Sequence, residues 1–148
     1  MNYLLDTNLV LIYLRDSPLA RKIEEDLNLL NGEHNLIVSV VTVGELRSLA
    51  KQNNWGRKKI QAMEDALSSF LIADINTEQI LEKYAEIDAF SQGKLKNTKT
   101  NFSSRNMGKN DLWIAATASV LDLELLTTDF DFLHLEGQFV KLRSLKIT

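Results

Sequence analysis

The sequence predicts an α/β protein in which a parallel sheet of four to five strands lies between helices on both faces. Short apolar runs alternate along the chain with longer segments of helical periodicity, a pattern typical of helix-covered parallel sheets. The first run, residues 3–5, is apolar at every position, which indicates a strand buried on both faces. The chain has 148 residues, 45% of them hydrophobic, and is long enough to bury a core of its own.

The strands and helices can be placed in order along the chain. Apolar and β-branched runs predict strands at 3–5, 36–39, 71–75 and 123–127, with a candidate fifth strand at 138–142. Apolar residues spaced three and four apart predict helices at 9–14, 19–30, 42–52, 57–70, 77–90 and 111–121. Asn31 and Gly32 are expected to end the second helix. Without an internal repeat or a second unit, residues 1–148 are expected to form a single domain.

Bulk composition limits the classes of protein that fit. Without cysteine, the chain forms no disulfide and no thiolate metal site. No apolar run approaches the roughly 18 residues of a membrane helix, and the N-terminus lacks a basic leader. We therefore expect a cytoplasmic protein without a membrane partner. The net charge of −3 argues against a strongly basic nucleic-acid binder, although it averages over local patches.

One long segment, residues 91–110, differs in character from the rest of the chain. It is rich in Ser, Asn and Thr and contains two glycines, so it predicts a loop. Its charged side chains are all basic: Lys94, Lys96, Lys99, Arg105 and Lys109. A polar connection of this length inside one domain is usually functional or disordered.

Four acidic residues are expected to meet at one edge of the sheet. Asp6 and Asp129 follow predicted strands, whereas Glu45 and Asp111 open predicted helices. In a parallel α/β sheet, strand carboxyl ends and helix amino ends lie at the same edge, where ligands bind. Clustered carboxylates raise one another's pKa unless a cation neutralises them, and Mg²⁺ or Mn²⁺ prefers such oxygen ligands. Such an ion can stabilise a scissile phosphate and activate a water, which fits a metal-dependent phosphodiesterase.

Each of these acids also has a purely structural explanation. Asp6 can cap the helix that follows it, and Asp111 complements the positive end of its helix. Thr42 and Glu45 fit a capping box, in which the glutamate bonds back to the amide of the capping residue. Asp129 can form an Asx turn. What the structural explanations leave unexplained is the position that the four acids share.

Four sequence blocks resemble the PIN domain, and within it they are most similar to the VapC toxins of bacterial toxin–antitoxin pairs. The blocks are YLLDTN at 3–8, VTVGEL at 41–46, NDLWIAATA at 110–118 and LTTDFDF at 126–132. They occur in the order and at the spacing of the family and span nearly the whole chain. Any one block is a weak signal, and the four together are a strong one.

The resemblance implies a PIN-like three-layer sandwich and a Mg²⁺- or Mn²⁺-dependent endoribonuclease. The enzyme would use water to cleave single-stranded or looped RNA, leaving a 5′-phosphate and a 3′-hydroxyl. The residues that match the family's catalytic and metal-binding acids are Asp6, Glu45, Asp111 and Asp129, with Asp6 and Asp111 as the chief metal ligands. The matching polar positions are Thr7, Asn8 and Thr127. Asp131 either supports Asp129 or is a spare ligand. The expected partners are a tRNA or rRNA substrate, a VapB-like antitoxin and a second copy of the chain.

Basic residues border the proposed site in sequence and are candidates for holding RNA. Cationic side chains around an acidic site would bind the phosphate backbone. The candidates are Arg47, Lys51, Lys94, Lys96, Lys99, Arg105 and Lys109. Trp55 can stack on a base. The alternative is that these charges form solvated faces and that Trp55 covers apolar surface. The 91–110 segment is longer than the link in many relatives, which bears on substrate preference.

Two other functions compete with the nuclease. One is a PIN-like module that binds RNA or protein without catalysis. The complete set of four acids argues against this function. The other is a small Mg²⁺-dependent phosphatase. For that function, Asp6-Thr7-Asn8 lacks the second aspartate that the haloacid-dehalogenase pattern places two residues after its nucleophile. RNA cleavage that is lost in Asp6→Asn would distinguish the nuclease from both.

Overall fold

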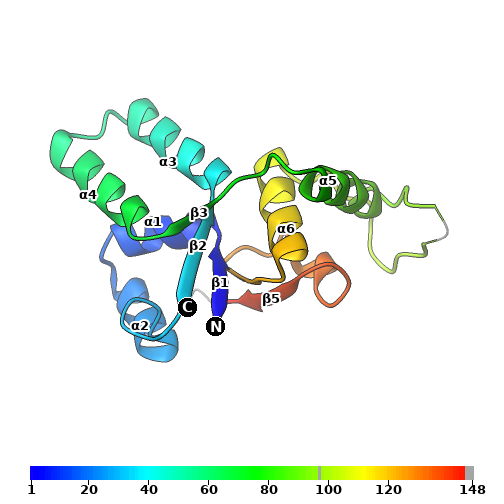
Figure 1. Ribbon diagram of the computed structural model, residues 1–148, viewed down its shortest axis with the longest axis horizontal. Helices are drawn as coiled ribbons and strands as arrows, with labels where there is room; N and C mark the ends of the chain where they lie inside the picture. The colour runs from blue at the N-terminus through cyan, green and yellow to red at the C-terminus, as the bar shows by residue number, and fades with distance from the viewer. Residues whose placement is uncertain (97, 146–148) are drawn as a thin grey trace.

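Five parallel strands form the central sheet of the computed structural model, which describes residues 1–96 and 98–145 (Figure 1). The strands are β1 (Asn2–Leu5), β2 (Asn35–Ser39), β3 (Leu71–Ala73), β4 (Glu124–Thr127) and β5 (Lys141–Ser144). They lie in the order β3-β2-β1-β4-β5, and every neighbouring pair is parallel. The predicted α/β class with a parallel sheet is confirmed.

Helices cover both faces of this sheet and make a three-layer arrangement (Figure 1). One side carries α1 (Thr7–Leu14), α2 (Pro18–Leu27), α3 (Val40–Gln52) and α4 (Arg57–Ser68). The other side carries α5 (Glu78–Ser91), α6 (Lys109–Leu121) and a 3₁₀ turn at Leu133–Leu135. Among the described residues, no helix has both the length and the apolar character needed to cross a membrane.

The two central strands bury both of their faces, as the apolar run at 3–5 predicted. In β1, Tyr3 and Leu5 pack into the core under α1 to α4, whereas Leu4 packs into the core under α5 and α6. In β4, Leu125 and Leu126 divide between the two cores in the same way. Because each buried leucine contributes about 1.5–3 kcal/mol, both helical layers are needed to stabilise the sheet.

The strand order reverses between β1 and β4. The chain first adds β2 and β3 on one side of β1 and then places β4 and β5 on the other side. In open α/β sheets, ligands bind outside the carboxyl ends of the strands at such a switch point. Asp6 directly follows β1, and Asp129 lies two residues after the end of β4. The fold therefore brings two of the predicted site residues to the place where ligands are expected.

The second helix ends earlier than predicted. It stops at Leu27, because Asn28 adopts a left-handed conformation (φ 49°, ψ 48°) and its N–H bonds to the Glu24 carbonyl. Gly32 still marks the turn, since its N–H donates to the Asn28 carbonyl at 2.8 Å. The expectation that Asn31 and Gly32 end this helix is therefore wrong. Both asparagines tolerate the left-handed region, so composition alone did not distinguish them.

The fifth strand is Lys141–Ser144, not 138–142 as predicted. The N–H groups of three residues in the predicted strand all donate to the Leu135 carbonyl, at 3.2, 2.9 and 3.2 Å: Gln138, Phe139 and Val140. These residues therefore form a turn on the 3₁₀ segment. Phe139 and Val140 are apolar because they pack against the core and not because they belong to the sheet.

The basic connection between α5 and α6 projects from one end of the molecule (Figure 1). The loop is shorter than the predicted 91–110, since α5 includes Ser91 and α6 begins at Lys109. We call it the 92–108 segment; its Asn97 lies outside the described residues. Its two ends are joined, because the Arg105 N–H donates to the Ser91 carbonyl at 2.7 Å. Leu95, Phe102 and Met107 pack against the core, so the segment is attached to the body of the protein.

Candidate active site

Asp6 lies buried at the end of β1, with 3% of its surface exposed. Its Oδ1 accepts a hydrogen bond from the Thr7 N–H at 2.8 Å and thereby caps α1. Its Oδ2 accepts a hydrogen bond from the Thr127 hydroxyl at 2.8 Å. Because Thr127 is the last residue of β4, Asp6 ties the two central strands together at the switch point. The capping explanation is confirmed, and it coexists with a position in the candidate site.

Glu45 reaches the same edge from α3. Ser39 caps this helix, since its Oγ accepts from the Val41 N–H at 3.1 Å. Thr42 is buried one turn further on, and its hydroxyl lies 2.9 Å from the Thr7 hydroxyl. Thr7 in turn donates to Glu45 Oε1 at 2.8 Å. The capping-box alternative for Thr42 and Glu45 is therefore wrong, and the glutamate is held by a residue of α1.

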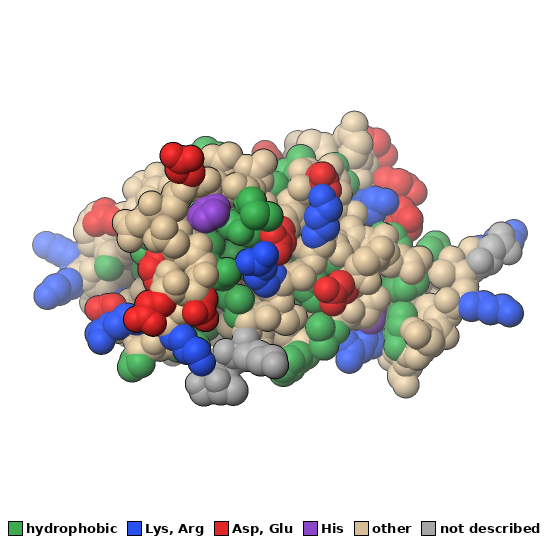
Figure 2. Space-filling model, turned by 90° about the horizontal axis from the view of Figure 1, so that it is seen from below, with side chains coloured by type: hydrophobic (Ala, Val, Ile, Leu, Met, Phe, Trp, Pro, Cys, Tyr) green, Lys and Arg blue, Asp and Glu red, His purple; other side chains and the backbone are tan. Residues whose placement is uncertain are grey.

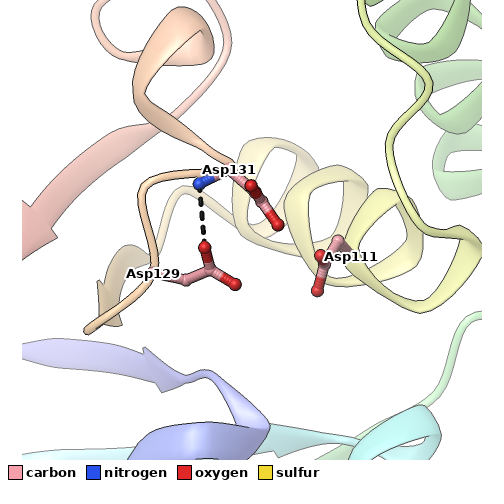
Figure 3. A group of neighbouring side chains, drawn as sticks. All are labelled: Asp111, Asp129 and Asp131. Carbon is pink, nitrogen blue, oxygen red and sulfur yellow. Dashed lines mark hydrogen bonds between the residues drawn. The ribbon is translucent and has the colours of Figure 1, made fainter.

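Asp111, Asp129 and Asp131 form a close group of carboxylates. Each offers an oxygen atom, and these three atoms lie within 4.8 Å of one another. Asp111 extends from the first turn of α6, and the other two extend from the loop after β4 toward the same space (Figure 3). The Asp131 N–H donates to Asp129 Oδ1 at 3.0 Å, so the predicted Asx turn at Asp129 is also present.

Two of the carboxyl groups at this edge have raised pKa values. The pKa of Asp111 is raised to about 7, first by burial and then by the negative charges of Asp6, Asp129, Asp131 and Glu45. Burial also raises the pKa of Asp6 to about 6, against the hydrogen bonds from Thr127 and Thr7. The five acids therefore share one electrostatic environment. Perturbed acids of this kind are typical of functional sites.

A divalent cation fits this donor set. All the available ligands are carboxylate oxygens, which are the donors that Mg²⁺ and Mn²⁺ prefer. A cation among them would remove the repulsion that raises the pKa of Asp111. Each carboxylate has about four lone-pair directions, so Asp6 and Glu45 can still accept further contacts. The close group consists of Asp111, Asp129 and Asp131, and it includes neither Asp6 nor Glu45. Direct contact of Asp6 and Glu45 with a metal stays a prediction.

The predicted supporting residues divide into two kinds. Thr7 and Thr127 hold Glu45 and Asp6 through the hydrogen bonds described above. Asn8 is exposed on α1, and within 1–96 and 98–145 its side chain makes no hydrogen bond. The sequence signal for Asp131 is its position two residues after Asp129 in the same loop.

Two grooves give access to the acids. One, of about 490 Å³, runs between α3 and α6 and is lined by Glu45, Asn110 and Trp113 among others. The second, of about 310 Å³, is lined by Asp131 and by residues 105–108 of the 92–108 segment. Both grooves are open to solvent, and each reaches one of the five acids: Glu45 in the first and Asp131 in the second.

The predicted RNA-binding cations lie in two places. Arg47 and Lys51 are exposed on α3, where Arg47 pairs with Glu64 of α4 through Nε and Nη2 at 3.1 and 3.2 Å. The other five lie in or next to the 92–108 segment and are exposed: Lys94, Lys96, Lys99, Arg105 and Lys109. Figure 2 shows basic side chains at the tip formed by this segment, whereas acidic and basic side chains are mixed over the body. The cations of the 92–108 segment are therefore more accessible to a ligand than Arg47 and Lys51 on α3.

Trp55 lies beside the α3–α4 turn, half-buried against the core on that side of the sheet. The Lys59 ammonium lies 4.0 Å from the centre of its ring. These contacts correspond to the structural alternative, in which Trp55 covers apolar surface. One face of the indole is already taken by a cation.

Comparison with known proteins agrees with this arrangement. The sequence matches the PIN domain family over residues 3–138. It is 32% identical over 127 residues to Ribonuclease VapC1 of Haemophilus influenzae strain R2866, and the match covers 86% of each chain. It is 30% identical over 132 residues to Ribonuclease VapC2 of H. influenzae strain KW20 / Rd, covering 87% of each chain.

Solved structures share the same fold. VapBC2 from Rickettsia felis, bound to a DNA fragment from its promoter, matches with a TM-score of 0.78 at 21% identity. VapBC-1 from nontypeable H. influenzae matches with a TM-score of 0.73 at 26% identity. Each match covers 97% of this chain and 98% of the other. Together with the matched sequence family, these likenesses establish that the chain belongs to the PIN-domain family.

Proposed function

We infer that this chain is a metal-dependent endoribonuclease of the VapC type. The observation that carries this inference is the convergence of five carboxyl groups at the switch point of the sheet. Its 32% identity to a VapC ribonuclease supports the same activity. The products expected of such an enzyme are a 5′-phosphate and a 3′-hydroxyl.

Asp111, Asp129 and Asp131 would hold Mg²⁺ or Mn²⁺, with Asp6 and Glu45 completing the site. When bound, the ion supplies charge stabilisation at the scissile phosphate and lowers the pKa of a water. The chain itself keeps the acids in place: Thr127 and the Thr7 amide fix Asp6, and the Thr7 hydroxyl fixes Glu45. Groups held in this way need little reorganisation during the reaction.

The basic residues of the 92–108 segment would hold the RNA backbone beside these acids. Arg105 and Lys109 come near the site, since Arg105 lines the groove that reaches Asp131 and Lys109 opens α6. Arg47 contributes less to binding than these residues, because Glu64 already neutralises it. A tRNA or a structured rRNA segment is the proposed substrate class.

The partner proposed for this chain is a VapB-like antitoxin, and the pair would act in the cytoplasm. VapBC-1 of H. influenzae is 26% identical over nearly the whole chain, and a toxin–antitoxin complex from Klebsiella pneumoniae matches at 24% identity with a TM-score of 0.64. FitAB bound to DNA, at 24% identity, has the same fold. A homodimer of the toxin is proposed on the family resemblance.

The test is RNA cleavage by the purified chain with Mg²⁺ or Mn²⁺, and then with EDTA, on a panel of tRNAs and rRNA fragments. Asp111→Asn should lower the cleavage rate at least about 100-fold, because it removes one of the three clustered carboxylates. Asp26→Asn removes an equal charge from an exposed position on α2 and should leave the rate unchanged. Equal rates for Asp111→Asn and the unmodified chain would refute the assignment of these acids.

A further inference from the structure

We propose that a pocket between the 92–108 segment and the 3₁₀ turn binds an unpaired base of the RNA and so helps to select the cleavage site. The proposal rests on the proposed function and adds to it a base-binding site. The pocket has a volume of about 550 Å³, within the usual range for small-molecule sites. None of the five acids lines it, and it shares Arg105 with the groove that reaches Asp131.

The pocket has an aromatic wall of the kind on which bases stack. The rings of Phe102 and His134 meet edge to face with centres 5.1 Å apart, and Phe90 supports Phe102 at 5.3 Å. Phe90 is buried, whereas Phe102 and His134 are half-exposed and line the pocket. Unpaired bases bind proteins largely by stacking on such rings.

Polar and charged side chains complete the pocket. Asn101 and Gln138 are exposed and carry amide donors and acceptors that can pair with a base edge. Lys99 and Arg105 contribute two positive charges against the single carboxylate of Glu136. Neither cation forms an ion pair with any residue of 1–96 or 98–145. This lining suits a nucleotide better than an amphipathic helix, which requires an apolar groove.

Arg105 connects this pocket to the candidate active site. It lines both the pocket and the groove that reaches Asp131. A strand of RNA with its phosphate near the acids can therefore place a neighbouring base in the pocket, with Arg105 beside the backbone between them. A base recognised there would fix which phosphate lies at the acids.

The pocket is held open by contacts at its base. Ser91 is fully buried and lies with its Oγ 2.7 Å from His134 Nε2, while its carbonyl accepts from the Arg105 N–H at 2.7 Å. These bonds fix the positions of His134 and Arg105 relative to α5. A pocket that is formed before binding loses less conformational entropy when the base enters.

The test measures binding in the Asp111→Asn background, so that RNA is held and not cut. Fluorescence anisotropy with short labelled oligo-A, oligo-C, oligo-G and oligo-U gives the affinity for each base over a range of salt concentrations. Phe102→Leu keeps an apolar side chain but removes the ring, and it should weaken binding roughly 5- to 150-fold and reduce the difference between bases. Phe102→Tyr keeps a ring and should bind as the parent does.

Two charge variants test whether Arg105 contacts the RNA directly or only adds to the overall positive charge. Arg105→Ala should weaken binding and lower the slope of log affinity against log salt by about 0.7. Lys22→Ala removes the same charge from an exposed position on α2 and should change neither quantity. Thermal melting of every variant checks that it is folded.

The same substitutions are then made in the active chain, and its cut sites on RNA are mapped. New or additional cut sites with Phe102→Leu support the proposal. If the chain cleaves RNA normally and Phe102→Leu changes neither the affinity nor the cut sites, the base-binding pocket is overturned while the proposed function stands. The same result is expected if a protein partner occupies the pocket. If the unmodified chain neither binds nor cuts any RNA, the proposed function fails and the pocket proposal fails with it.

Discussion

Asp111 is the residue in which folding and function conflict most clearly. Its pKa is raised to about 7, first by burial and then by the surrounding carboxylates. The folded chain therefore binds the Asp111 proton more tightly than the unfolded chain does between about pH 4 and pH 7. Stability consequently falls as the pH rises through this interval, since the folded state must accept a poorly solvated charge.

This conflict predicts that Asp111→Asn stabilises the metal-free protein at high pH. Near pH 8 the variant lacks the unfavourable charge and should melt higher, by roughly 2–4 °C for each kcal/mol removed. Near pH 4, where the native carboxyl is itself protonated, the two proteins should melt at similar temperatures. Calorimetry with EDTA measures both. An equal difference at the two pH values would contradict the raised pKa of Asp111.

At the residue scale, the sequence was informative about position and less informative about contacts. The edge shared by Asp6, Glu45, Asp111 and Asp129 followed from their places after strands and at helix starts. The partner of Glu45 did not follow, because Thr7 lies 38 residues away and the local pattern imitates a capping box. Local motifs and tertiary contacts can use the same residues, and only the fold distinguishes them.

Among the elements, the loop after β4 shows how a core residue positions functional ones. Phe132 is fully buried directly after Asp131, whereas Phe130 is 67% exposed between the two acids. The Phe132 ring anchors the end of the loop in the core, and the carboxylates of Asp129 and Asp131 extend toward Asp111 outside it.

Removing the two rings should affect stability to very different extents. Phe132→Ala should lower the free energy of unfolding by about 3–5 kcal/mol, because it leaves a cavity in the core. Phe130→Ala should change it by no more than about 0.5 kcal/mol, since that ring is in solvent. Urea unfolding of both variants makes the comparison, and similar losses would show that the loop is not anchored as described.

The elements also mark the limit of what the apolar pattern could predict. The central strands were placed almost to the residue, because both of their faces are buried and their sequence is continuously apolar. The edge strand β5 was misplaced, since Phe139 and Val140 are equally apolar but belong to a turn bonded to Leu135. A turn packed on the core and a strand within the core give the same signal.

At the scale of the whole molecule, the strand order explains why the acids are far apart in sequence. The switch point lies between β1 and β4, so residues near both ends of the chain must meet for the site to exist. Asp6 and Thr127, which are 121 residues apart, are joined by a hydrogen bond. The site is complete only in the folded chain, and metal binding should consequently favour folding.

Binding of Mn²⁺ or Mg²⁺ should therefore raise the melting temperature, and more strongly near pH 8 than near pH 5. Carboxylates must lose their protons to bind a cation. The pKa is about 7 for Asp111 and about 6 for Asp6. The free energy of unfolding should rise by about 2.7 kcal/mol when the metal concentration is 100 times its dissociation constant. Calorimetric titration at both pH values tests this. An affinity independent of pH would mean that these acids are not the ligands.

The neck of the 92–108 segment has a consequence for how this protein family can change. Its ends are clasped together, by the bond from the Arg105 N–H to the Ser91 carbonyl and by that from the Ser104 hydroxyl to the Gln92 carbonyl. We expect a change of length between these bonds to leave α5 and α6 in place, because the bonds close the loop at its base and lengthening a closed loop adds little entropy cost. The 92–108 segment can therefore vary in length, and the RNA preference proposed for it can vary with it, while the acids stay in place.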